Sequence, residues 1–251
     1  MKRLAAALAL PLVFGLLSGC SGDDGGDDGS GSGRLTVLAA ASLTDVYEEM
    51  ATGFEKATGA EVTFSFGSST DLAQQVADGA PGDVLATADQ TSMQVAEDAG
   101  VTGDVETFAT NVLTIVTPPD NPAGIRSLDD LEGATWVRCS DEAPCGRVAL
   151  AVLEANGVTA EPASLEDDVR ATLDKVTSGE ADAGLVYASD AVAAGDSVAT
   201  VEIPGAEHQL TSYLTTTLEQ GKDADLAQEW VDYVLSDKGQ AALADAGFSA
   251  P

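Results

Sequence analysis

Two short stretches rich in small hydroxyl residues have the chemistry to bind an anion. Residues 67–71 (GSSTD) follow the alternating apolar segment 62–66 and precede a helical pattern over 72–77. Residues 40–45 (AASLTD) stand in the same position after the apolar segment 35–39. A helix that begins at the end of a strand presents free backbone N–H groups and the positive end of its dipole. Neither stretch contains Lys or Arg, so the sequence predicts a small anion bound by hydrogen-bond donors alone.

The same two stretches also fit ordinary helix caps. Ser42 with Asp45, and Ser68 with Asp71, have the Ser-x-x-Asp spacing of a capping box. In that interpretation each serine satisfies N–H groups of its own helix and binds nothing else. Taken alone, the stretches leave both interpretations open.

The composition is that of a globular protein with a strong negative charge. The 251 residues, 44% hydrophobic and 21% charged, suffice for one large domain or two small ones. The formal net charge of −31 argues against nucleic acid and anionic lipid surfaces as partners. It also repels an anionic ligand at long range, so the attraction for such a ligand must be local.

The N-terminal residues predict export and a membrane anchor. Lys2 and Arg3 precede an apolar run over 4–17 that is too short to span a membrane comfortably, as in a signal peptide. The next residues, LSGC ending at Cys20, resemble the lipobox of bacterial lipoproteins. This resemblance implies removal of signal peptide 1–19, a lipid on the Cys20 sulfur, and a location at the outer face of the cell membrane. Residues 20–33 then form the lipidated cysteine and a flexible tether of Gly, Ser and Asp.

The two other cysteines, Cys139 and Cys145, are predicted to form a disulfide. An even pair six residues apart in an exported protein is most often bridged. Zinc is disfavoured, because His208 is the only histidine and no second pair of thiols exists. A catalytic thiol would need a histidine partner, and nothing in the sequence brings His208 near one.

Strand and helix patterns alternate from Arg34 onward, which favours an α/β fold with mainly parallel sheets. A β-prone run over 208–218 returns the chain to its first unit. We therefore expect a discontinuous first lobe, 34–113 plus 208–251, and a second lobe, 114–207. Two crossing segments would join the lobes, and a cleft between them would gather strand ends and helix N-termini. Beyond the segments above, strands are predicted over 83–87, 111–116, 135–138, 183–187 and 198–203, and helices over 44–57, 70–78, 90–99, 146–156, 167–177, 189–194, 224–235 and 238–246.

The second lobe offers further polar groups at the ends of its elements. Residues 144–147 open one helix, and residues 166–170 open the next. Tyr187 ends a strand, where its phenol is a neutral donor or an ordinary core side chain.

Two arginines at these helix starts are candidate cationic ligands. Arg147 and Arg170 both lie where they could reach the cleft. We expect them instead to pair with nearby carboxylates, such as those of Glu142, Asp167 or Asp168.

Taken together, the motifs resemble those of the molybdate-binding proteins of bacterial ABC importers. They run in family order over nearly the whole body, from about residue 34 to 248. The matching segments are 39–44 (AAASLT), 66–69 (FGSS), 79–84 (GAPGDV), 87–90 (TADQ), 168–170 (DVR) and 185–191 (LVYASDA). The resemblance implies a two-lobed type II periplasmic-binding fold that closes on molybdate or tungstate and passes it to a membrane permease.

The resemblance also implies which residues bind the oxyanion. Ser42 and Ser69 would each donate a hydroxyl and an N–H, Cys145 and Val169 their backbone N–H groups, and Tyr187 its hydroxyl. The family form best known has Ala where this chain has Cys145, but only the N–H is needed there, and a bridge to Cys139 would stiffen the loop. Molybdenum enters only as the bound oxyanion, without protein–metal bonds and without a cofactor, and a monomer is expected.

Two other functions stay open. A sulfate- or thiosulfate-binding protein would use the same fold and donors, so cavity size would have to separate the ligands. An exported enzyme acting on an anionic substrate is disfavoured, because no His-based triad, metal cluster or recognisably spaced carboxylate pair is present in the sequence. We therefore expect no enzymatic activity.

Overall fold

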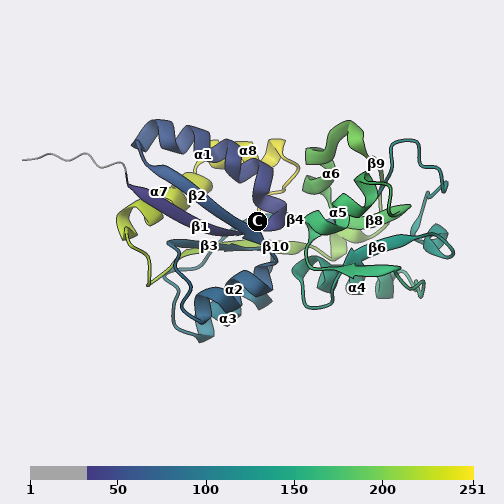
Figure 1. Cartoon of the computed structure of the whole chain (residues 1–251), viewed down its shortest axis with the longest axis horizontal. Helices are drawn as coiled ribbons and strands as arrows, with labels where there is room; N and C mark the ends of the chain where they lie inside the picture. Colours follow the sequence, from purple (N-terminus) through teal and green to yellow (C-terminus); the bar gives the residue numbers. More distant parts are fainter. Residues whose placement is uncertain (1–32) are drawn as a thin grey trace, which may run out of the picture. The chain divides into compact units, whose positions relative to one another are not determined.

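Two five-stranded sheets organise the chain (Figure 1). The computed structural model describes residues 33–251, and these all belong to one contact unit. The predicted signal peptide, the lipidation site at Cys20 and the tether up to residue 32 lie outside the described residues. Strands and helices alternate along much of the chain, which confirms the predicted α/β class.

The first sheet has the strand order β2-β1-β3-β10-β4. β1 pairs in parallel with β2 and β3, whereas β10 pairs antiparallel with β3 and β4. The chain therefore returns to this sheet near its C-terminal end. The five strands are β1 (Arg34–Ala40), β2 (Glu61–Gly67), β3 (Val84–Thr87), β4 (Glu106–Asn111) and β10 (Thr211–Thr217).

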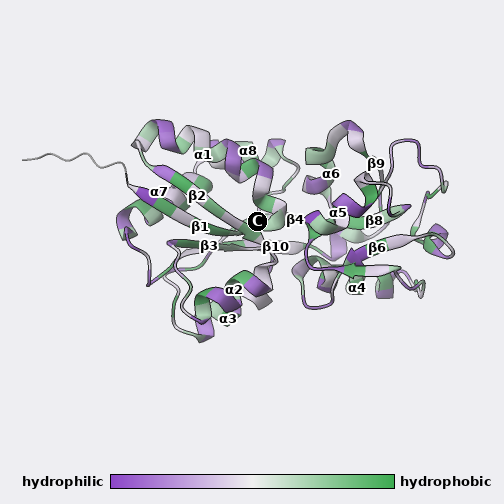
Figure 2. Ribbon diagram, in the orientation of Figure 1, coloured by the Kyte–Doolittle hydropathy of each residue, from purple (hydrophilic) through white to green (hydrophobic). Residues whose placement is uncertain are grey.

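Helices cover both sides of the first sheet, with α1 and α8 on one side and α2 and α3 on the other (Figure 1). Figure 2 shows that β1 and β3, which lie between the two groups of helices, are rich in hydrophobic residues. The helices of this lobe are α1 (Thr44–Thr58), α2 (Ser69–Ala77), α3 (Gln90–Asp98), α7 (Ala224–Leu235) and α8 (Asp237–Asp245).

Helix α1 illustrates how the sequence builds this packing. Val46, Met50 and Phe54 recur at a spacing of four and are buried as one stripe. Trp230 of α7 packs edge-on against Phe54, with ring centroids 5.2 Å apart. The helix ends at Gly59, which adopts a left-handed conformation with φ of 77°.

The second sheet has the order β7-β6-β8-β5-β9. β6 pairs in parallel with β7 and β8, while β5 pairs antiparallel with β8 and β9. Its strands are β5 (Leu113–Thr117), β6 (Trp136–Cys139), β7 (Ser164–Glu166), β8 (Ala183–Tyr187) and β9 (Ala199–Val201). Helices α4 (Pro144–Ala155), α5 (Val169–Thr177) and α6 (Ala188–Ala194) pack against it.

Both sheets are thus mixed, and the expectation of mainly parallel sheets is corrected. The antiparallel pairs come from β5 and β10, the strands next to the two passages between the sheets. The predicted strand 111–116 is in fact two strands, because β4 ends at Asn111 and β5 begins at Leu113. The Asn111 side chain accepts the Val112 N–H at 2.9 Å, which replaces a ladder hydrogen bond at the break. An apolar β-prone run gives no sign of this break in the sequence.

The second connection between the sheets, from β9 to β10, also differs from the prediction. Strand β10 begins at Thr211, whereas His208 is an exposed residue that ends a 3-10 turn, Ala206–His208. Short 3-10 turns also occupy Leu128–Leu131 and Gly195–Ser197. Within residues 33–251 no helix is long and apolar enough to cross a membrane.

Candidate functional site

The five residues expected to bind an oxyanion line one small cavity between the two sheets. Ser42 and Ser69 belong to the first lobe, and Cys145, Val169 and Tyr187 to the second. All five are buried. The volume of the cavity, measured for the centre of a water-sized sphere, is about 10 Å³, which is room for about one water molecule. This volume is far below that of the cavities that hold organic molecules.

Four of these residues lie in the first turn of a helix. Ser42 is in the 3-10 turn Ala41–Leu43 that follows β1, and Ser69 is the first residue of α2. Cys145 is the second residue of α4, and Val169 is the first of α5. Backbone N–H groups in a first turn have no acceptor within their own helix, and the helix dipole adds partial positive charge. Four helix starts therefore bring donors to one cavity.

The two site serines do not cap helices. Ser68, the N-cap of α2, makes no capping hydrogen bond with its side chain, and the N-cap of α1 makes none either. The Ser69 Oγ accepts a hydrogen bond from the Ala88 N–H at 2.9 Å, so its proton stays available to a ligand. The Ser42 Oγ lies 2.7 Å from the hydroxyl of Tyr213. The capping-box interpretation is therefore wrong for both stretches.

Tyr187 supplies a buried hydroxyl that has no hydrogen-bond partner among the described residues. Burial, with the charges of Asp89 and Asp190, raises the pKa of Tyr187 well above its ordinary value. The Thr211 hydroxyl acts to lower the pKa of Tyr187. Its own hydrogen bond is donated to the carbonyl of Ala88 and not to Tyr187. Tyr187 is thus a neutral donor at all physiological pH values. An unpaired buried hydroxyl costs about 1–3 kcal/mol, which an accepting ligand oxygen would recover.

The wall of the cavity carries no Lys or Arg among the residues that the structure describes. Asp168 is the one formally charged residue that lines it. Its Oδ1 accepts the N–H groups of Arg170 and Ala171 at 2.8 and 2.9 Å, so its charge is stabilised by the start of α5. A bound anion would therefore be held by neutral donors.

Arg147 pairs across the cleft and not within its own lobe as expected. Its Nε and Nη2 lie 2.7 and 2.6 Å from the Asp89 Oδ2 in the first lobe. A further Nη2 contact joins it to the Ser92 hydroxyl at 3.0 Å. Glu142 contributes only its backbone carbonyl to Arg147, not its carboxylate. The predicted carboxylate partner for Arg147 is therefore wrong.

Arg170 behaves in the same way. Its Nη2 contacts the carboxylate of Asp45 in α1, and its Nε lies 3.5 Å from the Oδ1 of Asp190. Burial raises the pKa of Asp190 to about 7, against the opposing effect of Arg170. The predicted partners Asp167 and Asp168 are thus replaced by one carboxylate from each lobe. Neighbours in sequence suggested the wrong partners because Asp190 lies 20 positions away in the chain and Asp45 belongs to the other lobe.

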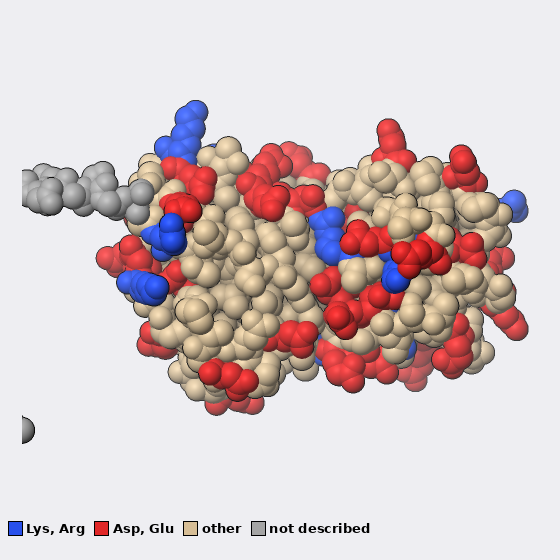
Figure 3. Space-filling view, viewed as in Figure 1, with Lys and Arg blue, Asp and Glu red and all other residues tan. Residues whose placement is uncertain are grey.

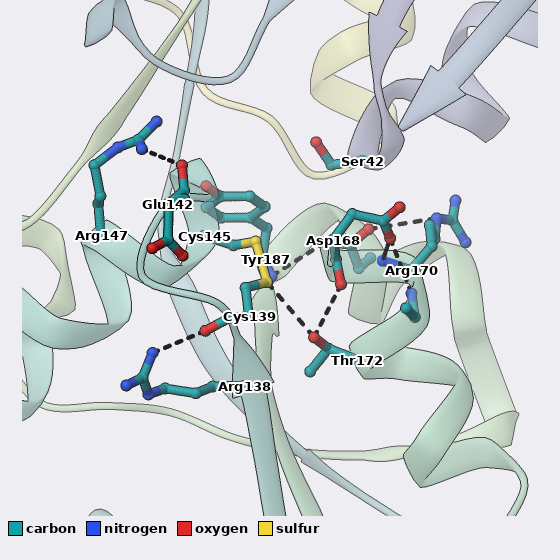
Figure 4. The surroundings of a disulfide bond; sticks show 12 residues. Ser42, Arg138, Cys139, Glu142, Cys145, Arg147, Asp168, Arg170, Thr172 and Tyr187 are labelled. Carbon is teal, nitrogen blue, oxygen red and sulfur yellow. Dashed lines mark hydrogen bonds and ion pairs between the residues drawn. A yellow bond between two sulfur atoms is a disulfide. The ribbon is translucent and has the colours of Figure 1, made fainter. Parts of the chain in front are cut away.

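Cys139 and Cys145 form a disulfide that ties the end of β6 to the start of α4. Figure 4 shows this disulfide beside the ring of Tyr187, with Ser42 facing both from the other lobe. Gly146 packs so closely that an added Cβ would lie 1.7 Å from the Ser140 carbonyl oxygen. Bridge and close packing together fix the backbone that carries the Cys145 N–H.

Several polar residues at the site are not apparent from the sequence motifs. Tyr213 reaches Ser42 across 171 positions of the chain, and Arg147 reaches Asp89 across 58. No spacing of residues along the sequence indicates such long-range contacts. In the described part of the chain, no cluster of His, Cys, Asp or Glu could hold a metal ion.

Residues 35–249 match the family profile of bacterial extracellular solute-binding proteins. The molybdate-binding protein ModA of Mycobacterium tuberculosis is 36% identical over 88% of this chain and 86% of the relative. ModA of Escherichia coli is 33% identical over 80% of this chain and 83% of the relative. These relatives confirm the resemblance that the motifs predict.

Solved structures share the fold. The periplasmic molybdate-binding protein of Azotobacter vinelandii superposes with a TM-score of 0.78 at 22% identity, covering 86% of this chain and 99% of that one. The sulfate-binding protein SubI of Mycobacterium tuberculosis reaches 0.76 at 20% identity, covering 87% of each chain. The predicted two-lobed binding-protein fold is confirmed, and this fold serves proteins named for different oxyanions.

Proposed function

The chain belongs to the bacterial extracellular solute-binding protein family, and we propose that it captures molybdate or tungstate and delivers it to an ABC-type permease. One observation carries the proposal. Five buried residues that offer donors surround a small cavity that no Lys or Arg lines, namely Ser42, Ser69, Cys145, Val169 and Tyr187. The names of the relatives at 36% and 33% identity support the same ligand.

A wall of donors selects ions that carry no proton. Molybdate and tungstate are fully deprotonated dianions at neutral pH, so every oxygen accepts. Hydrogen phosphate would leave one donor facing a proton, and an unpaired buried donor costs about 1–3 kcal/mol. Hydrogen bonds to an ionised acceptor are roughly twice as strong as neutral ones, which offsets the missing counter-charge. Sulfate presents the same pattern with shorter bonds, so its exclusion depends on the size and rigidity of the cavity.

The surrounding charge makes this local attraction necessary. Acidic side chains are spread in patches over the face seen in Figure 3, with fewer basic ones, and the chain carries 42 acidic against 11 basic residues. Their long-range field repels a dianion. Capture must then come from the N–H and hydroxyl groups of the cavity at short range.

The same proposal includes the place of the protein in the cell. A lipid on Cys20 would hold it at the outer face of the membrane, where a monomer could meet its permease without a cofactor and without catalysing a reaction. Metabolic labelling with a fatty acid, with Cys20→Ser as the comparison, tests the anchor. Label that persists in Cys20→Ser would refute it.

Isothermal titration calorimetry with molybdate, tungstate, sulfate and phosphate tests the ligand. We expect one-to-one binding of molybdate and tungstate and none of phosphate. Ser69→Ala should weaken every oxyanion that binds, since it removes a hydroxyl donor. Binding of sulfate alone would keep the fold and move the function to a sulfate-type protein. Turnover of a phosphate or sulfate ester would instead indicate an enzyme.

A further inference from the structure

The loop between β6 and α4, which we call the bridged loop (residues 139–145), lines the oxyanion cavity and also contacts the first lobe. Its last three residues, 143–145, form part of the cavity wall. Just before them, the carbonyl of Glu142 accepts a hydrogen bond from the Thr70 hydroxyl of α2 at 2.7 Å. The bridged loop therefore stands between the two lobes at the edge of the cavity.

The bridged loop is held firmly within its own lobe. The disulfide joins its two ends, and both cysteines are buried. Between them, the Ser140 N–H donates to the Glu166 carbonyl at 2.8 Å, and the Ser140 carbonyl accepts the Ala143 N–H at 3.1 Å. A loop that is closed by a covalent bond and tied by its backbone has little freedom to follow the size of a ligand.

The contact is also firm on the side of the first lobe. Thr70 is the second residue of α2, directly after the site residue Ser69. Its Oγ1 lies 3.1 Å from the Ser92 Oγ and 3.3 Å from the Arg147 Nη2. Figure 4 shows that Arg147 also donates to the same Glu142 carbonyl, beside the disulfide. The start of α2 cannot move closer to the bridged loop without displacing these groups.

A firm loop in contact with α2 limits how far the two lobes can close. Ser69 and Cys145 offer donors from opposite sides of this contact, so the contact sets the shortest distance between those donors. Sulfate has shorter bonds than molybdate, and the two sides would have to come closer before all donors could reach it. A buried donor that the ion cannot reach stays unpaired, which is unfavourable.

We propose that the bridged loop, resting against Thr70, is a specificity-determining spacer that keeps the cavity too wide for sulfate. The inference rests on the proposed function and names the residues that would choose between the two ions. Neutral donors cannot make this choice by themselves, because sulfate is also a dianion whose oxygens all accept hydrogen bonds. The spacer makes the choice by distance.

Calorimetry with molybdate, repeated with sulfate as a competitor, tests the inference. Thr70→Ala removes the side chain against which the bridged loop rests, and alanine is well tolerated in a helix. Because the lobes could then come closer, we expect the ratio of the sulfate Kd to the molybdate Kd to fall about tenfold, the effect of one hydrogen bond gained by a charged group. Thr70→Ser keeps the hydroxyl that contacts the Glu142 carbonyl and should restore most of the ratio.

The disulfide is tested in the same assay. Cys139→Ala combined with Cys145→Ala frees the bridged loop and keeps the backbone N–H at position 145, so the same ratio should again fall about tenfold. Val176→Ala is the matched control, because it removes buried atoms in the last turn of α5, away from the bridged loop. It should lower the melting temperature but leave the ratio within about twofold.

The possible outcomes separate this inference from the proposed function. An unchanged ratio in Thr70→Ala would overturn the inference alone, even if the variant without the disulfide folds poorly. Equal weakening of both ions in that variant, as expected for a merely structural bridge, would do the same. So would a wild-type protein that binds sulfate as tightly as molybdate. A wild-type protein that binds neither molybdate nor tungstate would overturn the proposed function and this inference with it.

Discussion

The ion pair between Arg147 and Asp89 gives the sharpest test of how the site closes. Arg147 lies in α4 of the second lobe, and Asp89 precedes α3 in the first, so the pair exists only while the lobes are in contact. Binding proteins of this fold close around their ligand by a hinge motion. An interaction confined to the closed state should therefore strengthen ligand binding without stabilising the open protein.

Asp89→Asn is the perturbation of choice. Asp89 also caps α3, where its Oδ1 accepts the Ser92 N–H at 2.8 Å, and asparagine preserves that cap. A hydrogen bond to a charged group contributes about 1.5–3 kcal/mol. Both side chains keep some solvent contact, at 28% and 16% exposure, so we reduce the expected loss to about 1–2 kcal/mol. This corresponds to a Kd weaker by about fivefold to thirtyfold.

The assay combines calorimetry with a chase of labelled molybdate by an excess of unlabelled ion. We expect most of the change in the dissociation rate, because a contact that forms after encounter acts on the bound state. Glu61→Gln is the matched control, since Arg34 and Glu61 form an exposed pair at 2.8 Å within one lobe. It should change neither Kd nor dissociation.

The sign of the effect makes the test decisive. Asp89 is a negative charge close enough to the cavity to raise the pKa of Tyr187. If simple repulsion of the anion dominated, Asp89→Asn would bind molybdate more tightly. Tighter binding, or a loss matched by a lower melting temperature of the ligand-free protein, would refute the closure argument.

Three further predictions concern the second lobe. Gly146→Ala should lower the melting temperature and abolish tight binding in calorimetry, because its Cβ would collide with a backbone oxygen. Reducing the Cys139–Cys145 bridge should cost about 2 kcal/mol of unfolding free energy in a denaturant titration, as expected for so short a loop; an unchanged midpoint would contradict this. The pKa of Asp190, raised to about 7, gives stability that is complete at low pH and lost as pH rises through about 7, so Asp190→Asn should flatten the decline in melting temperature from pH 5 to 8.

Much of the fold follows from local patterns in the sequence. The stripe of Val46, Met50 and Phe54 defines α1, and most of the other helices and strands lie close to where the periodicity predicts them. The two segments that connect the sheets cannot be predicted from local sequence patterns in this way. The break at Asn111 depends on a side chain that replaces a strand hydrogen bond, and such a contact leaves no periodic signal.

The residues of the candidate site also differ in how well local sequence patterns predict them. Residues at helix starts, such as Ser69 and Val169, stand out because helix termini have sequence signals of their own. Residues that act through long-range contacts, such as Tyr213, do not. The arginine partners were mispredicted for the same reason, since proximity in sequence favours Asp168 while the fold brings Asp45 to Arg170.

The arginines beside the cavity are placed where they do not line it, although the protein as a whole is strongly acidic. Arg147 and Arg170 lie at the starts of α4 and α5, beside Cys145 and Val169, and each contacts a carboxylate of the opposite lobe, while Arg170 also lies 3.5 Å from Asp190 in its own lobe. A cation in the cavity wall would bind any anion, protonated or not. Under the proposed function, the same cations, used between the lobes instead, would strengthen closure and leave the choice of ligand to the geometry of neutral donors. Selectivity and closure would then rest on different residues, and we expect substitutions at Asp89 to change how long an oxyanion stays bound without changing which oxyanion is chosen.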